Sequence, residues 1–452
     1  MRPLVRCLLL LFLAITIPSR PVLAQPSFET GMIPADHILI PEGDVSANIF
    51  LISDGDGWGQ DEEKEASELK NAGAIVVGID LPKYLTALAN DTRDCIYMIS
   101  DVESLAHQIQ RSAGTNNYQP PIIAGAGEGG TLALAMIAQS PMATIGEAFA
   151  VDPAAGIALA KDLCTPASKN HMGDRTIYGL TDGPLPAGVT VLFSPAAHSD
   201  GRSHVSSLVA DHPDIAVREV DTDAADTLST ILNDRVSSHG KHDEPLGLPI
   251  TVLDTPPTLD TMAVIYSGDG GWRDIDEQVG AVLQKSGIPV VGVDSLKYFW
   301  SQQTAEETAS DLSRIIDTYR HRWKVSHVLL AGYSFGADVL PATYNLLPPD
   351  DQARVKQLTL LALSRQVDYQ ISVTGWLGLK GEGAAGDPVD DVTKIDPKRV
   401  QCVYGTQEDD DPCPLLKTKG VEAIGIAGGH HFDEDYEALG ARIIHSLQAR
   451  LQ

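Results

Sequence analysis

The sequence is poor in positive charge. Its 33 lysine and arginine residues stand against 61 acidic residues, which gives a formal net charge of −28. This charge disfavours nucleic acid or an anionic membrane surface as an electrostatic partner, because both would repel the protein. It permits a cationic ligand, although an acidic surface most often only keeps a protein solvated. With 43% hydrophobic residues the chain can form large cores, and its 452 residues suggest two or three domains.

Long hydrophobic runs are absent after the first 24 residues. Arg2 and Arg6 precede a short apolar stretch, residues 8–17, and Val-Leu-Ala at 22–24 supplies a small-residue cleavage site. This pattern is typical of a secretory signal peptide, and the stretch is short for a membrane span. We therefore expect an exported protein that starts at Gln25 and resides in a bacterial periplasm. An uncleaved anchor remains the alternative.

Cysteine is scarce. Once Cys7 is removed with the signal peptide, Cys95, Cys164, Cys402 and Cys413 remain. An even number in an exported protein favours two disulfides. Cys402 and Cys413 are close in sequence and flank an acidic loop, so we expect them to pair, which leaves Cys95 with Cys164. The chain has no C-x-x-C pair and no supporting histidine spacing, so neither a zinc site nor another cofactor is expected.

The remaining chain contains an internal duplication. Residues 48–58 return at 262–272, and residues 74–84 return at 288–298, both at an interval of 214 positions. Two matches in one register indicate two copies of one domain, since the interval is far longer than that of solenoid repeats.

We divide the chain accordingly. Residues 1–24 are the expected signal peptide, 25–240 the first domain, 241–250 a linker rich in glycine and proline, and 251–452 the second domain.

Short apolar runs alternate with amphipathic segments in each copy, which predicts a mostly parallel sheet with helices on both faces. We expect two tandem α/β-hydrolase-like domains, of which the first is degenerate. In the second copy we expect strands at 262–267, 288–293, 326–331, 357–363, 399–404 and 421–426, and helices at 274–286, 304–322 and 337–347.

A nucleophile motif follows the third of these strands. Residues 332–336 read Gly-Tyr-Ser-Phe-Gly, and a helical pattern begins immediately afterwards. The order strand, G-x-S-x-G, helix is that of the nucleophile elbow in α/β-hydrolases, where a serine stands exposed on a strained turn. Ser334 is therefore the candidate nucleophile. The alternative is a glycine-rich turn whose serine only caps the helix.

The partners of such a serine should follow in the order acid, then histidine. The strand at 399–404 leads into an acidic loop, in which Asp410 is the favoured triad acid and Asp409 and Asp411 are the alternatives. The final strand ends in Gly-Gly-His-His, which makes His430 the candidate base and His431 its neighbour.

Two further groups are candidates for binding. The N–H of Phe335 and one from the glycine-rich loop at Gly268 and Asp269 are the expected oxyanion donors. Lys297 and Tyr298 follow the second strand at its carboxyl end, where they could contact substrate. The first copy repeats these residues, so a structural salt bridge is at least as good an explanation.

The first copy lacks the nucleophile. Its elbow keeps the turn glycines, but Gly127 stands at the serine position, and no Gly-His-His sequence closes this copy. A glycine cannot attack a carbonyl, so the first domain is expected to be catalytically inactive. A structural role and the recognition of a lipid, a partner or the second domain both stay open.

Four motifs together resemble the AcvB/VirJ family of bacterial virulence-associated proteins. They lie at residues 267–272, 293–300, 332–338 and 428–432. Longer AcvB-type members carry two such domains and an export signal. The resemblance implies a periplasmic serine hydrolase that releases the amino acid from aminoacyl-phosphatidylglycerol, typically lysyl-phosphatidylglycerol. It also implies a phospholipid substrate at the membrane surface and a link to virulence and type IV secretion.

Two other functions are compatible with the sequence. One is a non-catalytic periplasmic adaptor or chaperone for virulence or secretion proteins, which the inactive first copy would suit. The other is a general carboxylesterase, thioesterase or acyltransferase with a different substrate. Reaction of Ser334 with a fluorophosphonate separates an enzyme from an adaptor.

Overall fold

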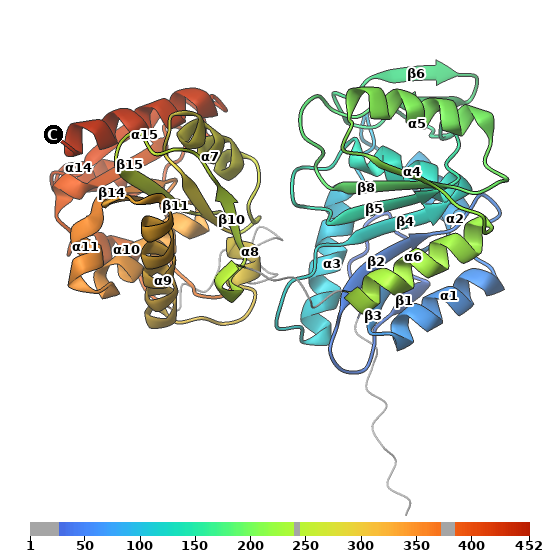
Figure 1. The fold of residues 1–452 in the computed structure, drawn as a ribbon, viewed down its shortest axis with the longest axis horizontal. Helices are drawn as coiled ribbons and strands as arrows, with labels where there is room; N and C mark the ends of the chain where they lie inside the picture. Colours follow the sequence, from blue (N-terminus) through green and yellow to red (C-terminus); the bar gives the residue numbers. More distant parts are fainter. Residues whose placement is uncertain (1–26, 239–244, 372–384) are drawn as a thin grey trace, which may run out of the picture.

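The computed structural model describes residues 27–238, 245–371 and 385–452. The expected signal peptide and residues 241–244 of the expected linker lie outside the described residues. Figure 1 shows two domains side by side, each built around its own twisted sheet with helices on both faces. No helix in the described ranges is long and apolar enough to cross a membrane.

The second domain contains a seven-stranded sheet in the order β10-β12-β11-β13-β14-β15-β16. β10 pairs antiparallel with β12, and the other neighbours pair in parallel. The strands are β10 (Ile250–Leu253), β11 (Thr261–Tyr266), β12 (Val290–Val293), β13 (His327–Tyr333), β14 (Val355–Leu361), β15 (Val400–Gly405) and β16 (Glu422–Ile426). The helices are α7 (Ile275–Lys285), α8 (Ser295–Tyr298), α9 (Ala305–Trp323), α10 (Phe335–Leu346), α11 (Pro349–Arg354), α13 (Pro388–Val392), α14 (Cys413–Lys417) and α15 (Tyr436–Arg450), with 3-10 turns at Pro245–Gly247 and Pro397–Arg399.

The first domain repeats this topology as β1-β3-β2-β4-β5-β8-β9, again with an antiparallel edge strand. Its strands are β1 (His37–Leu39), β2 (Ala47–Ile52), β3 (Ala74–Ile79), β4 (Ile122–Ala126), β5 (Glu147–Val151), β8 (Gly188–Phe193) and β9 (Ala216–Glu219), and a separate hairpin joins β6 (Lys169–Met172) to β7 (Arg175–Tyr178). The helices are α1 (Gln60–Asn71), α2 (Leu81–Ala89), α3 (Ile99–Ala113), α4 (Gly127–Ile137), α5 (Ser199–Asp211) and α6 (Ala224–Ser238). The α/β-hydrolase-like fold predicted from the sequence is confirmed.

The central strands are buried on both faces, which explains why they read as continuous apolar runs. In β11, Val264 and Tyr266 belong to the core on one side of the sheet, while Ala263 and Ile265 belong to the core on the other. The edge strand β10 was not predicted, because its half-buried residues lie where the linker was expected to end.

The repeated motifs hold each fold together. Trp272 lies against the backbone of Gly292 in β12, and Trp58 lies against Gly78 in the same way. Asp294 caps helix α8 by accepting the N–H of Lys297. The corresponding aspartate of the first domain caps α2. These parts of the duplication therefore serve folding in both copies.

Both predicted disulfides are present. Cys95 is bonded to Cys164 in the first domain, and Cys402 to Cys413 in the second. The second bond joins β15 to the start of α14 across a sequence separation of 11. Two disulfides fit a protein of an oxidising compartment.

Removal of the short disulfide should destabilise the second domain. In the variant Cys402→Ala/Cys413→Ala, the free energy of unfolding of this domain should fall by about 3 kcal/mol, because the unfolded chain regains the entropy of a loop of this length. Urea unfolding measures the change. The matched variant Cys95→Ala/Cys164→Ala frees a longer loop and should lower the stability of the first domain by about 4 kcal/mol. Unchanged unfolding midpoints in both variants would contradict this account.

Candidate active site

Ser334 stands on a strained turn between β13 and α10. Its backbone has φ 49° and ψ −116°, a conformation that non-glycine residues rarely adopt. Such a conformation costs on the order of 1–3 kcal/mol and persists only where the surrounding structure enforces it. A Cβ on Gly336 would lie 2.2 Å from the carbonyl oxygen of Tyr266, and one on Gly332 would lie 2.4 Å from the carbonyl oxygen of Gly336. Glycine is therefore required where strand and helix meet.

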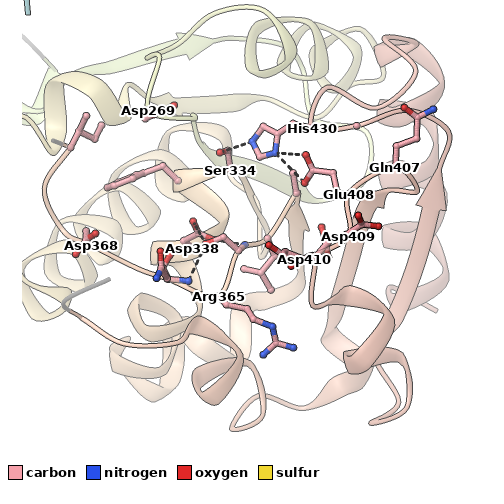
Figure 2. A pocket seen from close by; sticks show the side chains of 18 of the residues that line it. Asp269, Ser334, Asp338, Arg365, Asp368, Gln407, Glu408, Asp409, Asp410 and His430 are labelled. Carbon is pink, nitrogen blue, oxygen red and sulfur yellow. Dashed lines mark hydrogen bonds and ion pairs between the residues drawn. The ribbon is translucent and has the colours of Figure 1, made fainter. Parts of the chain in front are cut away.

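Three side chains form a connected row at the carboxyl end of the sheet (Figure 2). Ser334 Oγ lies 2.8 Å from His430 Nε2. On the other side of the imidazole, Nδ1 lies 3.2 Å from Glu408 Oε1. Nucleophile, base and carboxylate thus stand within hydrogen-bonding reach of one another, in the order of the Ser-His-acid arrangement.

The structure places a different carboxylate against His430 from the one that the sequence favours. Asp410 lines the same cavity, and Glu408 lies 3.2 Å from His430 Nδ1. The reason is the turn after β15. The N–H of Gln407 donates to the carbonyl oxygen of Gly428 and that of Glu408 donates to the carbonyl oxygen of Gly405. These bonds hold Glu408 against the histidine loop. In the sequence, the signal for Glu408 was that it is the acidic residue of this loop nearest to the end of β15.

The histidine loop is held from below by Tyr333. The Tyr333 hydroxyl donates to the carbonyl oxygen of His430 at 3.3 Å and lies 3.3 Å from Nδ1 of His431. The two imidazole rings meet edge to face. His430 therefore faces the serine, while His431 packs beside Tyr333, as the sequence suggested for a neighbouring residue.

The expected oxyanion donors lie on two elements beside the serine. The N–H of Phe335 is the first of helix α10, where helical N–H groups have no acceptor within the helix. In the loop after β11, the N–H of Gly268 donates to the buried carboxyl of Asp276 at 3.3 Å, so Gly268 supports the loop. Asp269, the next residue, lines the cavity with Ser334 and Phe335.

The first domain shows what these N–H groups can bind. Asp54 Oδ1 accepts the N–H of Gly55 at 2.7 Å and the N–H of Glu128 at 2.8 Å. By the repeat register and the two elbows, the corresponding N–H groups in the second domain are those of Asp269 and Phe335.

The same carboxylate also lies against the position of the missing nucleophile. A Cβ on Gly127 would lie 2.4 Å from Asp54 Oδ1, so a serine there would require the Asp54 side chain to move. Glu128 is also engaged by an ion pair with Arg175 of the β6–β7 hairpin. The first domain therefore keeps an oxyanion-type pair of donors that is filled by its own side chain.

The site opens into an acid-lined cavity of about 820 Å³. Among the described lining residues, Arg365 is the one with a permanent positive charge, which leaves the negative charges in clear excess. The acidic lining residues are Asp269, Asp338, Asp368, Glu408, Asp409, Asp410 and Asp411. Such a cavity attracts a cationic group and repels an anionic one.

Burial alters the protonation of two of these acids. Asp338 accepts the N–H and the hydroxyl of Ser364 at 2.8 and 2.9 Å, and burial raises the pKa of its carboxyl well above the usual range. Burial also raises the pKa of Asp411 to about 6, although the N–H of Cys413 donates to its Oδ1. Asp411 therefore changes charge near physiological pH.

Two predicted binding residues do not reach the cavity. Lys297 pairs with Asp294, its own helix cap, at 3.7 Å. Tyr298 is buried, and its hydroxyl donates to Asp311 at 2.7 Å. Neither residue is among the lining residues, so the structure corrects their assignment as substrate contacts and favours the structural alternative.

Metal-type donors approach one another at one place in the described ranges. Cys402, Asp411 and Cys413 lie within ligand distance of one another, but the two sulfur atoms form a disulfide and offer no thiolate.

One family model matches the second domain, which contains the site. Residues 260–451 match the model of the bacterial virulence protein (VirJ) family, and the first domain lies outside the match. A search of curated proteins finds no match.

Several solved structures are similar over part of the chain. Est1E from Butyrivibrio proteoclasticus with bound ferulic acid is 15% identical, with 44% of this chain and 94% of that one covered and a TM-score of 0.32. The Pyrobaculum calidifontis esterase is 18% identical, with 42% and 77% covered and a TM-score of 0.31. Proline iminopeptidase from Mycobacterium smegmatis is 11% identical, with 45% and 94% covered and a TM-score of 0.33. Similarity at this level carries no information on the substrate.

The geometry predicts that Glu408, rather than Asp410, supports the histidine. Glu408→Gln should slow the reaction of Ser334 with a fluorophosphonate by about 10²- to 10⁴-fold, because the amide no longer stabilises the imidazolium. Asp410→Asn should have a much smaller effect. Labelling rates followed by mass spectrometry decide between the two acids. A larger loss of labelling rate in Asp410→Asn than in Glu408→Gln would favour Asp410 as the triad acid.

Proposed function

We propose that this protein, whose residues 260–451 match the VirJ family, is a serine hydrolase that cleaves the aminoacyl ester of aminoacyl-phosphatidylglycerol. Lysyl-phosphatidylglycerol is the substrate we expect. The observation that carries the proposal is the row Ser334–His430–Glu408 at the mouth of an acid-lined cavity. The two-domain AcvB type and a periplasmic location are part of the same proposal.

The first half of the reaction acylates the serine. Ser334 Oγ attacks the ester carbonyl carbon while His430 Nε2 takes the hydroxyl proton. The carbonyl oxygen becomes an oxyanion that accepts the N–H groups of Phe335 and Asp269. When the tetrahedral intermediate collapses, the bond to the glycerol oxygen breaks. His430 returns its proton to that oxygen, and phosphatidylglycerol leaves.

The second half releases the amino acid. Water occupies the place of the departed alcohol, and His430 Nε2 takes one of its protons as the oxygen attacks the aminoacyl carbonyl. A second tetrahedral intermediate forms in the same oxyanion hole. It collapses as the bond to Ser334 Oγ breaks and His430 Nε2 returns its proton to Oγ, which releases the free carboxylic acid and restores Ser334. Through both halves Glu408 accepts a hydrogen bond from Nδ1 and stabilises the imidazolium at 3.2 Å.

Charge supports an aminoacyl substrate. A lysyl ester brings an α-ammonium and a side-chain ammonium into a cavity whose lining is predominantly acidic. A neutral acyl group, such as a general carboxylesterase or thioesterase would bind, gains no electrostatic attraction from such a lining. The net charge of −28 also disfavours unmodified phosphatidylglycerol, which carries a phosphodiester and no ammonium group. The product phosphatidylglycerol should therefore bind more weakly than the lysyl ester.

The proposal also covers the location of the protein and the processes that it affects. The two disulfides suit an exported protein, and the substrate would lie in a membrane surface facing the same compartment. Removal of amino acids from this lipid would restore negative charge to the surface. We infer a role in membrane lipid homeostasis, through which virulence or secretion systems would be affected.

Substitution of the serine tests the chemistry. Ser334→Ala should abolish release of lysine from lysyl-phosphatidylglycerol in mixed micelles, because no other group on the turn can attack the ester. Thin-layer chromatography of the lipid and mass spectrometry of the amino acid provide the measurement. The control Ser326→Ala alters an exposed serine before β13 and should retain the wild-type rate. Lysine release by Ser334→Ala would refute the nucleophile, and wild-type inactivity on every aminoacyl lipid would refute the substrate.

The raised pKa of Asp411 predicts a pH effect on substrate binding. As the pH falls through about 6, Asp411 takes up a proton and the cavity loses one negative charge. The KM for a lysyl ester should then rise by about three- to fivefold, since the ammonium groups lose part of their attraction. Asp411→Asn should show the higher KM already at pH 7 and lack this step. A neutral ester serves as the control. Identical KM profiles for wild type and Asp411→Asn would contradict the effect.

A further inference from the structure

Helix α3 of the first domain reaches the active-site side of the second domain. Figure 1 shows α3 on the side of its sheet that faces the neighbouring domain. Its middle contacts the segment that follows the oxyanion loop, through Glu103. Its end contacts the segment around Trp300 and Ile371, through Arg111. The first contact therefore lies beside the loop that carries Asp269, and the second lies on segments that reach Phe335 through Phe299.

The first contact is an ion pair between domains. Arg273 Nη1 lies 2.7 Å from Glu103 Oε1 and 2.6 Å from the hydroxyl of Thr144. Both partners of the ion pair are largely buried, with 18% and 14% of the side chains exposed. The Arg273 guanidinium also lies against the backbone of Gly270, where a Cβ would be 2.7 Å from its Nη2. Glu103 thus holds an arginine that supports the loop at Asp269.

The backbone beside this arginine is strained. Asp274 has φ 49° and ψ −116°, the same dihedral angles as Ser334. A strained residue keeps its conformation only when its surroundings enforce it. Glu103 anchors the residue next to Asp274, so the first domain contributes to that enforcement.

The second contact leads to Phe335. The guanidinium of Arg111 donates to the carbonyl oxygens of Trp300 and Ile371 and lies 3.7 Å from the centre of the Trp300 ring. Ile371 lines the cavity, and its N–H donates to the carbonyl oxygen of Phe299 at 2.9 Å. The Phe299 ring in turn meets the ring of Phe335 edge to face at 5.0 Å.

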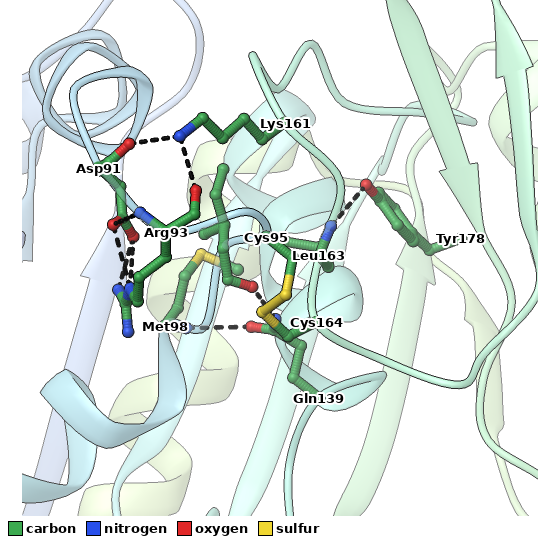
Figure 3. Close-up of a disulfide and its surroundings, with 10 residues drawn as sticks. Asp91, Arg93, Cys95, Met98, Gln139, Lys161, Leu163, Cys164 and Tyr178 are labelled. Atoms are coloured by element: carbon green, nitrogen blue, oxygen red, sulfur yellow. Dashed lines mark hydrogen bonds and ion pairs between the residues drawn. A yellow bond between two sulfur atoms is a disulfide. The ribbon is translucent and has the colours of Figure 1, made fainter.

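The helix itself is anchored firmly at its start (Figure 3). Cys95, bonded to Cys164, lies just before α3, and the N–H of Met98 donates to Gln139 at 3.2 Å. Two backbone bonds of 2.8 Å join Ile96 to the segment that carries Cys164. A helix fixed in this way can hold groups of the other domain in place.

We propose that α3 of the catalytically inactive domain is a positioning element for the oxyanion hole of the second domain, with Glu103 and Arg111 as its positioning residues. The proposal rests on the proposed serine-hydrolase function. Oxyanion donors stabilise the transition state only when they are already in place, so a displaced loop lowers kcat more than it changes KM. The first domain then has a role that requires no nucleophile of its own.

Glu103→Gln tests this inference in the full-length chain. The amide keeps the size and an acceptor oxygen but removes the charge that holds Arg273. We expect about a tenfold lower kcat for a chromogenic ester with KM within about twofold, and an equally slower reaction of Ser334 with a fluorophosphonate. Amide hydrogens of residues 267–276 should exchange faster. Glu68→Gln, the same change on the solvent-facing side of helix α1, is the matched control and should behave as wild type.

The outcomes separate this inference from the proposed function. Wild-type kcat, labelling and hydrogen exchange in Glu103→Gln would overturn the positioning role. If Glu103→Gln does not fold, Arg111→Lys takes its place, because lysine keeps the charge but loses the two-carbonyl contact. A wild-type protein whose Ser334 never reacts would contradict the proposed function. Hydrogen exchange would still decide whether α3 holds the loop.

Discussion

The strained turn at Ser334 is the constraint on which the rest of the second domain depends. Its dihedral angles are tolerated because β13 and α10 meet in contact and glycines flank the serine. The turn lies where the strand order changes direction, between β11 and β13, so the loop after β11 stands beside it. From the other side, the ends of β15 and β16 bring Glu408 and His430 to within hydrogen-bonding reach. The backbone conformation of Ser334 therefore fixes the point around which the other groups of the site are arranged.

Comparison of the two copies of the fold separates the residues that serve folding from the residues that serve chemistry. The first domain keeps the topology, the tryptophan that packs on the neighbouring strand and the aspartate that caps a helix. In place of a nucleophile it has Gly127, and the carboxylate of Asp54 fills the paired donors. The Asp54 side chain therefore occupies the donors that correspond to those of Asp269 and Phe335. Through α3, the first domain contacts Arg273, which follows the loop at Asp269, and Ile371, which lines the cavity.

Much of this architecture was predictable from the sequence. The fold class, both disulfides and six strands of the second sheet followed from periodicity, cysteine number and repeat register, which can be read without knowledge of the contacts in space. The identity of the acid was not predictable from the sequence. Four carboxylates share one loop, and only the hydrogen bonds of the turn direct Glu408 at the imidazole. Lys297 and Tyr298 were placed near the cavity by topology, yet their partners Asp294 and Asp311 turn them into structural residues. The contacts of α3 depend on how two domains meet, which no local pattern records.

Capture of the covalent intermediate tests the central claim most directly. Brief reaction with lysyl-phosphatidylglycerol, acid quenching and peptide mass spectrometry should reveal a lysyl group on the peptide that contains Ser334, because deacylation must await a water molecule in the same site. The adduct should be absent from Ser334→Ala. Lipid cleavage that proceeds at full rate without an adduct, or with an adduct on another residue, would contradict the account.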